Sequence, residues 1–83
     1  MKVTVKYFAS IREAIGSGME SIDTSAKTLD QLRDELIAKD SAHAQALARG
    51  KSVRMALNQI MSDGTAVLAP GAEIAFFPPV TGG

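Results

Sequence analysis

Cysteine is absent from the 83 residues of this chain, and its absence removes several classes of function at once. Without thiols the chain has no disulfide framework, no thiolate ligands for a metal and no cysteine nucleophile. One histidine, His43, is too little for a zinc site built from this chain alone, so we predict no metal site. We also assign His43 no role, because a lone histidine without a catalytic partner in the pattern is typically a surface residue.

An excess of charge of either sign and long apolar runs are missing as well. Nine basic side chains balance nine acidic ones, which leaves no basic excess to drive binding to nucleic acid or to an anionic membrane. No apolar stretch approaches the ~20 residues of a membrane-spanning helix, and the N-terminus carries no signal-peptide pattern. We therefore predict a cytoplasmic protein with neither a nucleic-acid nor a membrane partner.

The length of the chain allows one small domain, and its 46% content of hydrophobic residues is that of an ordinary globular protein. Periodicity and turn residues predict the following elements: strands at 2–8, 19–23, 53–58 and 73–77, a short helix at 11–15, the main helix at 29–39, a helical piece at 40–49, turns at 62–64 and 70–71, and a short edge element at 67–68.

Local patterns support these elements. Val3, Val5 and Tyr7 alternate with polar residues, which places them on the core face of the first strand. Two capping boxes, Ser10 with Glu13 and Thr28 with Gln31, mark the starts of the short and the main helix. The main helix carries an apolar stripe that we expect to lie across the sheet: Leu29, Leu32, Leu36 and Ile37.

The order of the elements predicts the fold class. Two strands, a long helix and further strands in so short a chain indicate an α+β protein, with a mixed sheet and one main helix packed on one face. This is the β-grasp arrangement of ubiquitin, and we assign it to residues 1–77. The helical crossover allows the first and the last strand to pair in parallel at the centre of the sheet.

Residues 78–83 are predicted to be a flexible tail. Pro78 and Pro79 cannot donate to a sheet, so they end the last strand, and each favours an extended chain at the residue before it. Fully extended, these six residues reach roughly 20 Å from the domain. A stiff spacer of this kind indicates a tail that is held away from the body, whereas an ordinary frayed end has no use for one.

Two glycines and a free carboxylate form the tip of this tail. Gly82 and Gly83 lack Cβ atoms, so their backbone fits a channel that excludes larger residues. The carboxylate of Gly83 is a poor electrophile until an ATP-using partner adenylates it. The tail is therefore interpreted as a reactive handle.

Three segments make the sequence recognisable. They are Phe-Ala-Ser-Ile-Arg-Glu at 8–13, Ala-Leu-Asn-Gln at 56–59 and the terminal octet Phe-Phe-Pro-Pro-Val-Thr-Gly-Gly at 76–83. Together the segments resemble the small, sulfur-carrying subunits of molybdopterin synthases, over essentially the whole chain. The octet carries most of the resemblance. Its last two residues alone would be unspecific, because ubiquitin and the sulfur carrier of the thiamin pathway also end in Gly-Gly.

The resemblance implies a β-grasp carrier without a catalytic site of its own. An E1-like enzyme would use ATP to adenylate Gly83, and sulfur would replace AMP to give a C-terminal thiocarboxylate. The tail would enter the large catalytic subunit of a heterotetrameric synthase, with Thr81 and Gly82 lining the channel, and pass sulfur to cyclic pyranopterin monophosphate. The chain itself would bind no cofactor. Because it has no thiol, sulfur can travel only on the terminal carboxyl group.

A partner interface is predicted beside the tail. Phe8 and Phe77 fall on the sheet face opposite the main helix, and Met61 follows a turn that we expect to bring it near them. By resemblance, this face meets both the activating enzyme and the large subunit. The predicted interface comprises Phe8, Arg12, Met61, Phe77, Pro78, Pro79 and Val80. The alternative is a set of scattered surface hydrophobes of the kind most proteins have.

Two other functions stay open on the sequence. One is a sulfur carrier for another product, such as the thiamin thiazole or thiolated tRNA. The other is a plain β-grasp interaction module with an inert C-terminus.

Overall fold

The computed structural model describes residues 1–79, and the predicted flexible tail therefore lies outside it from Val80 onward. The elements in chain order are β1 (Lys2–Tyr7), α1 (Ala9–Ile15), β2 (Met19–Asp23), α2 (Leu29–Ile37), α3 (Ser41–Leu47), β3 (Arg54–Leu57), β4 (Ile60–Ser62) and β5 (Glu73–Phe77).

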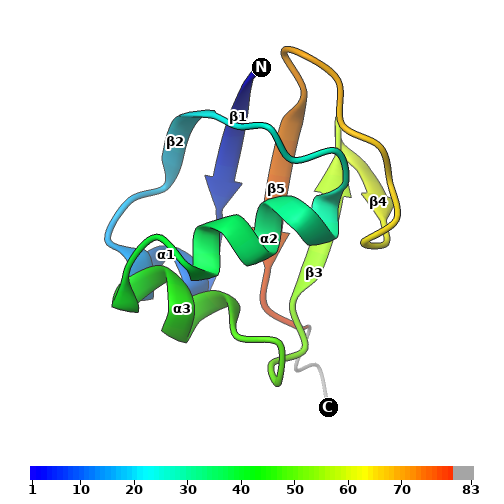
Figure 1. The fold of residues 1–83 in the computed structure, drawn as a ribbon. Helices are drawn as coiled ribbons and strands as arrows, with labels where there is room; N and C mark the ends of the chain where they lie inside the picture. The colour runs from blue at the N-terminus through cyan, green and yellow to red at the C-terminus, as the bar shows by residue number, and fades with distance from the viewer. Residues whose placement is uncertain (80–83) are drawn as a thin grey trace.

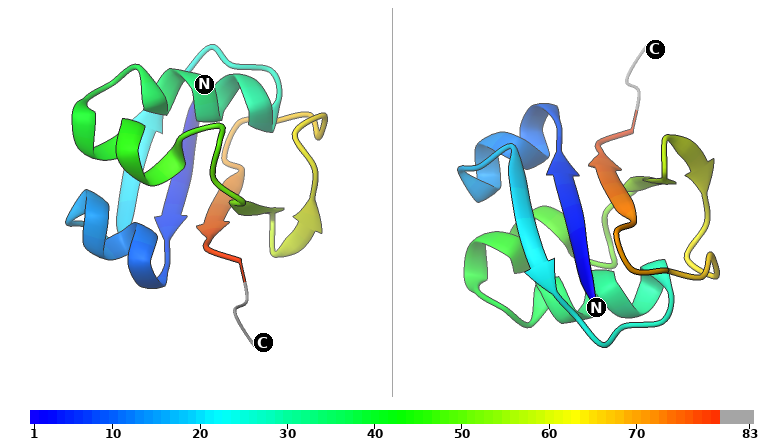
Figure 2. Two further views of the ribbon diagram at one scale, coloured as in Figure 1. Left: turned by 90° about the horizontal axis from the view of Figure 1, so that it is seen from below. Right: turned by 90° about the horizontal axis from the view of Figure 1, so that it is seen from above.

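These strands form one mixed sheet with the order β2-β1-β5-β3-β4. β1 pairs in parallel with β5 at the centre, and the other neighbouring pairs are antiparallel. α2 crosses one face of the sheet, with α3 on the same side (Figures 1 and 2). The predicted β-grasp arrangement and its central parallel pair are confirmed. Because β1 and β5 run the same way, β1 leads into α1 at the end of the sheet where β5 leads into the C-terminal segment.

The core lies between the sheet and α2. Eight side chains of three elements are buried there, with at most 2% of their surface exposed: Val3, Val5 and Tyr7 of β1, Leu29, Leu32 and Leu36 of α2, and Ile74 and Phe76 of β5. Ile37, the last residue of the predicted stripe, is only partly buried. Burial of each such large apolar side chain stabilises a fold by about 1.5–3 kcal/mol. The alternation of the strands and the helical stripe of α2 therefore supply most of the cohesion of this small domain.

The two helix starts turn out differently. The Thr28 side chain accepts a hydrogen bond from the Gln31 amide and caps α2, as predicted. Ser10 does not cap α1, because the helix already begins at Ala9 and Ser10 lies inside it. There the carbonyl of Phe8 accepts from the amides of Ile11 and Arg12, so the backbone of Phe8 ends β1 and starts the helix. The predicted strand at 2–8 accordingly stops at Tyr7.

A short strand that the sequence did not predict, β4, precedes the predicted turn, in which the Ala66 amide donates to the Asp63 carbonyl. Asn58 and Gln59 both have positive φ angles, 51° and 69°, as in the tight two-residue turns that join antiparallel strands. The Asn58 amide and side-chain oxygen bond the backbone of Glu73, which anchors this turn to β5. Without a glycine in the turn, the hairpin had no clear sequence pattern. The predicted edge element at 67–68 is an isolated bridge between Val67 and Thr28.

Candidate functional site

Two aromatic rings stack on the sheet face away from α2. The centroids of Phe8 and Phe77 are 4.8 Å apart and their planes differ by 12°. Their chain neighbours Tyr7 and Phe76 lie opposite each other in the parallel pair and stack in the core, 6.0 Å apart. An aromatic dipeptide on each central strand thus produces one stack on each side of the sheet. The buried stack belongs to the core, whereas the other leaves 41% of Phe8 exposed.

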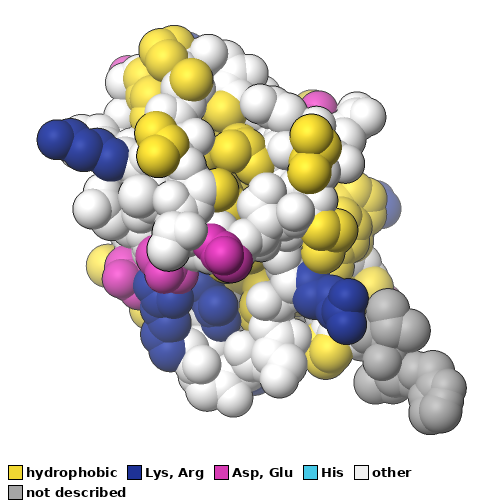
Figure 3. Space-filling model, turned by 90° about the vertical axis from the view of Figure 1, so that its right-hand side faces the viewer, with side chains coloured by type: hydrophobic (Ala, Val, Ile, Leu, Met, Phe, Trp, Pro, Cys, Tyr) yellow, Lys and Arg dark blue, Asp and Glu magenta, His cyan; other side chains and the backbone are white. Residues whose placement is uncertain are grey.

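The exposed stack forms one wall of an open groove of about 540 Å³. The groove is lined by Phe8, Ala9, Arg54, Met61, Phe77, Pro78 and Pro79. Five of the residues predicted for the partner interface therefore meet in one place: Phe8, Met61, Phe77, Pro78 and Pro79. Figure 3 shows hydrophobic side chains with basic ones beside them on the side of the molecule that carries β3 and β4. We call the groove lined by these seven residues the aromatic groove.

Arg54 was not predicted as a site residue. It pairs in register with Phe77, and this register places Arg54 on the lining of the aromatic groove. Among the described residues that line the groove, Arg54 is the only charged one. An apolar surface with a single cation suits a partner that presents apolar side chains and an acidic group. The alternation of β3 could have shown that Arg54 is exposed, but only the pairing with β5 places it beside Phe77.

Arg12 lies outside the aromatic groove. It lines a separate hollow with Ala9, Glu13 and Gly16. Its side chain packs over Gly18, where a Cβ atom would lie 3.1 Å from the guanidinium Nε. Ala9 lines both hollows, so a partner reaching Arg12 would have to extend around the start of α1. The predicted contact through Arg12 stays a prediction.

The predicted reactive group lies beyond the described chain. Val80, Thr81, Gly82 and Gly83 are outside residues 1–79, so their roles also stay predictions. The described chain leads toward them through Pro78 and Pro79, which follow β5 directly and line the aromatic groove. A partner that binds this groove would therefore be adjacent to the segment that carries Gly83.

His43 is not the surface residue that the sequence predicted, because only 4% of it is exposed. Its Nδ1 lies 2.7 Å from the Asp40 carboxylate and its Nε2 lies 2.7 Å from the Glu20 carboxylate. Glu20 also accepts from the Tyr7 hydroxyl at 2.6 Å and from the Lys39 ammonium at 2.7 Å. Asp40 caps α3 three residues before His43, a local pattern that could have been noticed, whereas Glu20 is 23 residues away.

This cluster holds a charged imidazole. A neutral imidazole has one N–H, so contact of both ring nitrogens with carboxylates requires the protonated form. Burial by itself lowers the pKa of His43, but the hydrogen bonds to Glu20 and Asp40 outweigh it and the pKa is raised. Burial likewise opposes ionisation of Glu20, yet its bonds to His43, Lys39 and Tyr7 bring its pKa down to about 2. The hydrogen bonds of Glu20 to Tyr7 and His43 join β1, β2 and α3. None of the residues of this cluster lines the aromatic groove.

The charge on His43 predicts a pH-dependent stability. A histidine with a raised pKa stabilises the fold fully below its unfolded pKa of about 6.5, and this contribution is lost as the pH rises through the folded value. The contribution of Glu20 is lost in a different window, as the pH falls below about 4.5 toward 2. We expect His43→Gln to lower the melting temperature by about 4–8 °C near pH 6, as for a loss of about 1 kcal/mol in a domain of this size.

Melting curves followed by circular dichroism from about pH 6 to about pH 9 test this prediction. The gap between wild type and His43→Gln should narrow as the pH rises, because the wild type loses the charge that the variant never had. Two curves that stay parallel across this range would show that folding does not raise the pKa of His43.

The fold defines the class of protein: a mixed sheet with a helix across one face is the β-grasp of ubiquitin-like proteins. Solved structures agree with this. SAMP1 from Haloferax volcanii superposes with a TM-score of 0.78 at 28% identity, with all of both chains covered. A chain in a complex of subunits 1 and 2 of molybdopterin-converting factor from Helicobacter pylori gives 0.70 at 28% identity, again with full coverage.

The family model of the ThiS family matches residues 5–83, and the chain belongs to this family, together with the sulfur carrier subunits of molybdopterin synthases. The molybdopterin synthase sulfur carrier subunit of Escherichia coli is 37% identical over 81 residues, 98% of this chain and 99% of the relative. That of Haemophilus influenzae is 38% identical over the same length, with the same coverage. The resemblance seen in the sequence is confirmed. Within residues 1–79, no helix has the length and apolar character needed to cross a membrane.

Proposed function

We propose that this chain carries sulfur for molybdopterin synthesis on the carboxyl group of Gly83. The observation that carries the proposal is the end-to-end match with sulfur carrier subunits, which spans 98% of this chain and 99% of the Escherichia coli protein. The absence of cysteine from the chain supports the same reading, because the terminal carboxyl group is then the one place for sulfur to be bound covalently.

The chemistry takes place at one carbonyl carbon. An E1-like enzyme transfers AMP from ATP to the Gly83 carboxylate, and pyrophosphate leaves. A sulfur nucleophile then attacks the carbonyl carbon, the bond to the AMP oxygen breaks, and a thiocarboxylate results. In the large subunit this sulfur attacks a carbon of cyclic pyranopterin monophosphate and displaces an oxygen from that carbon. Water then cleaves the bond between the sulfur and the Gly83 carbonyl carbon and restores the carboxylate. The role of this chain is to position the group, with Thr81 and Gly82 in the partner's channel.

Partner binding would use the aromatic groove. The Helicobacter pylori neighbour is described as a complex of subunits 1 and 2, and we propose that this chain likewise pairs with a large catalytic subunit. Phe8 and Phe77 offer a stacked aromatic pair, and Arg54 offers one cation at its edge. Aromatic and arginine side chains of this kind are the usual centres of binding energy at protein interfaces. Contact through Arg12 would extend the interface around α1.

Other carriers share this fold, so the choice of pathway depends on the similarity in sequence. The structural neighbour SAMP1, a small archaeal modifier protein, is 28% identical. The molybdopterin synthase subunits of Escherichia coli and Haemophilus influenzae are 37% and 38% identical. The match with these two subunits over nearly their full length favours molybdopterin synthesis, and sulfur carriage for thiamin or for tRNA thiolation stays the alternative.

Intact-mass measurement tests the proposal. The purified chain is incubated with the E1-like enzyme, ATP and a sulfide source, and a matched sample omits ATP. We expect a fraction of the first sample alone to gain the mass difference between one sulfur and one oxygen atom, and fragmentation should place the gain on Gly83. If no such fraction forms, the chain is not a carrier of this kind and the inert interaction module becomes the better description.

A further inference from the structure

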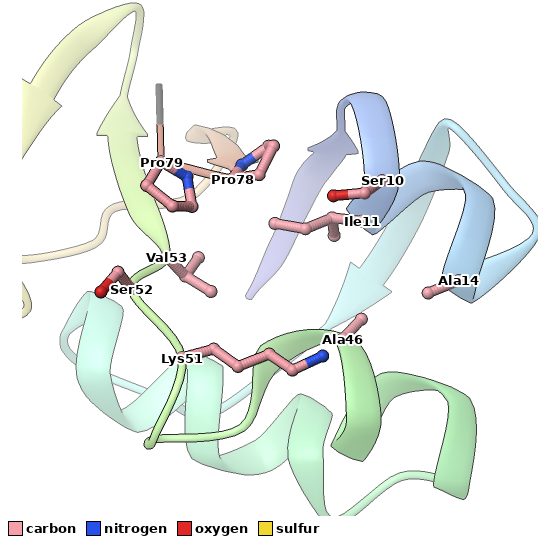
Figure 4. A pocket seen from close by; sticks show the side chains of 9 residues that line it. All are labelled: Ser10, Ile11, Ala14, Ala46, Lys51, Ser52, Val53, Pro78 and Pro79. Atoms are coloured by element: carbon pink, nitrogen blue, oxygen red, sulfur yellow. The ribbon is translucent and has the colours of Figure 1, made fainter. Parts of the chain in front are cut away.

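A second groove lies at the base of the tail, on the opposite side of Pro78 and Pro79 from the aromatic groove. It has a volume of about 350 Å³ and is lined by Ser10, Ile11, Ala14, Ala46, Lys51, Ser52, Val53, Pro78 and Pro79. Figure 4 shows Ile11 and Val53 pointing into the space, with Lys51 extended along the side opposite the two prolines. We call this hollow the lysine groove.

The lining of the lysine groove has a definite chemistry. Six of its residues are apolar, and two of these are alanines from α1 and α3, which leave room where larger side chains would fill the space between the helices. Lys51 is the only charged residue among the described ones that line it, and no described carboxylate shares the groove. A complementary occupant therefore presents an aliphatic side chain together with a carboxylate.

The aromatic groove alone is too small for a stable protein interface. A specific protein interface buries about 800 Å² and some 20–30 residues on each partner. The whole chain exposes 4798 Å², and only seven residues line the aromatic groove. Pro78 and Pro79 line both grooves, so a partner that encloses the segment after them meets the lysine groove as well as the aromatic one.

We propose that the lysine groove binds a segment of the large catalytic subunit that carries an aliphatic side chain next to an aspartate or glutamate. The proposal rests on the proposed function, because it assumes that the large subunit encloses the tail. It adds a second contact: the aromatic groove holds one side of the tail base, and the Lys51 ammonium pairs with the partner's carboxylate on the other side.

Two variants test the lysine groove. Lys51→Glu reverses its charge, and Ala14→Trp fills its mouth from an exposed position on α1. Lys27→Glu and Ala69→Trp make the same changes at exposed positions that line neither groove. Affinity for the purified large subunit is measured by calorimetry with the unmodified full chain, and thermal melting checks that each variant folds.

We expect Lys51→Glu and Ala14→Trp each to weaken binding about tenfold, with both controls within about twofold of wild type. The effect of Lys51→Glu should shrink at high salt because ions screen charge pairs, whereas that of Ala14→Trp should not. Such a pattern supports the proposal.

Three results would overturn it. If both groove variants bind like wild type while Phe77→Ala binds weakly, the lysine groove is not an interface and the proposed function stands. If wild type does not bind the large subunit at all, the proposed function fails together with this inference. If sedimentation shows that wild type dimerises and Lys51→Glu does not, the groove is occupied by a second copy of this chain.

Discussion

Removal of Gly83 is expected to abolish sulfur transfer and to leave the folded domain intact. The deletion moves the terminal carboxylate back by roughly 3.5 Å, the length of one extended residue. A displacement of about 1 Å of a reacting group already costs about 100-fold in rate, so the loss here should exceed about 1000-fold. Formation of molybdopterin by the reconstituted synthase, supplied with the activating enzyme, ATP and a sulfur source, measures the effect.

Two further measurements make this deletion informative. Its melting temperature should match that of wild type, because the core described above ends at Phe76, well before the deleted residue. Its affinity for the large subunit should also fall far less than its activity. Retention of substantial activity without Gly83 would mean that the terminal carboxyl group is not the site of sulfur attachment.

Alanine at the adjacent positions 76 and 77 is expected to produce opposite defects. Phe76 is fully buried in the core, and loss of its ring should cost about 3–5 kcal/mol of a total stability of about 5–10 kcal/mol. Phe77 is half-buried on the other face, where its loss removes a stacked pair that contributes about 0.5–1.5 kcal/mol. Phe77→Ala should instead weaken binding to the large subunit by about 30-fold, the effect of an interface centre that contributes about 2 kcal/mol.

The two variants are each other's control, because they remove the same ring from neighbouring residues. Chemical denaturation gives the free energy of unfolding, and calorimetry with the large subunit gives the affinity. A Phe77→Ala variant that is unchanged in affinity would exclude the aromatic groove as the interface. A Phe76→Ala variant as stable as wild type would contradict the description of the core.

Much of the fold was predictable because local sequence patterns report the geometry of the backbone. A strand turns successive side chains to opposite faces, so Val3, Val5 and Tyr7 were assigned to the core without knowledge of their neighbours. The same rule put Phe77 on the face opposite the main helix. The predicted interface residues on that face met as expected, and the parallel pairing of β1 and β5 explains why, since it places Phe8 beside Phe77.

The errors share a different cause. His43 was misassigned because its partner Glu20 lies on β2, far away in the chain, and no periodicity encodes that contact. Arg54 was missed because its place beside Phe77 depends on the register between β3 and β5. The strand β4 was missed because its turn uses Asn58 and Gln59 in a backbone conformation that glycine usually adopts.

The order of the residues was thus enough to predict the class of the fold and the faces of the strands, and to exclude thiol chemistry. Each of these follows from local rules: strand and helix periodicity, the conformational limits of proline and glycine, and the absence of cysteine. The folded chain was needed to show the charged cluster around His43, the place of Arg54 on the lining of the aromatic groove, and the lysine groove. These features join residues from separate elements, and the packing and register that bring them together are properties of the whole domain.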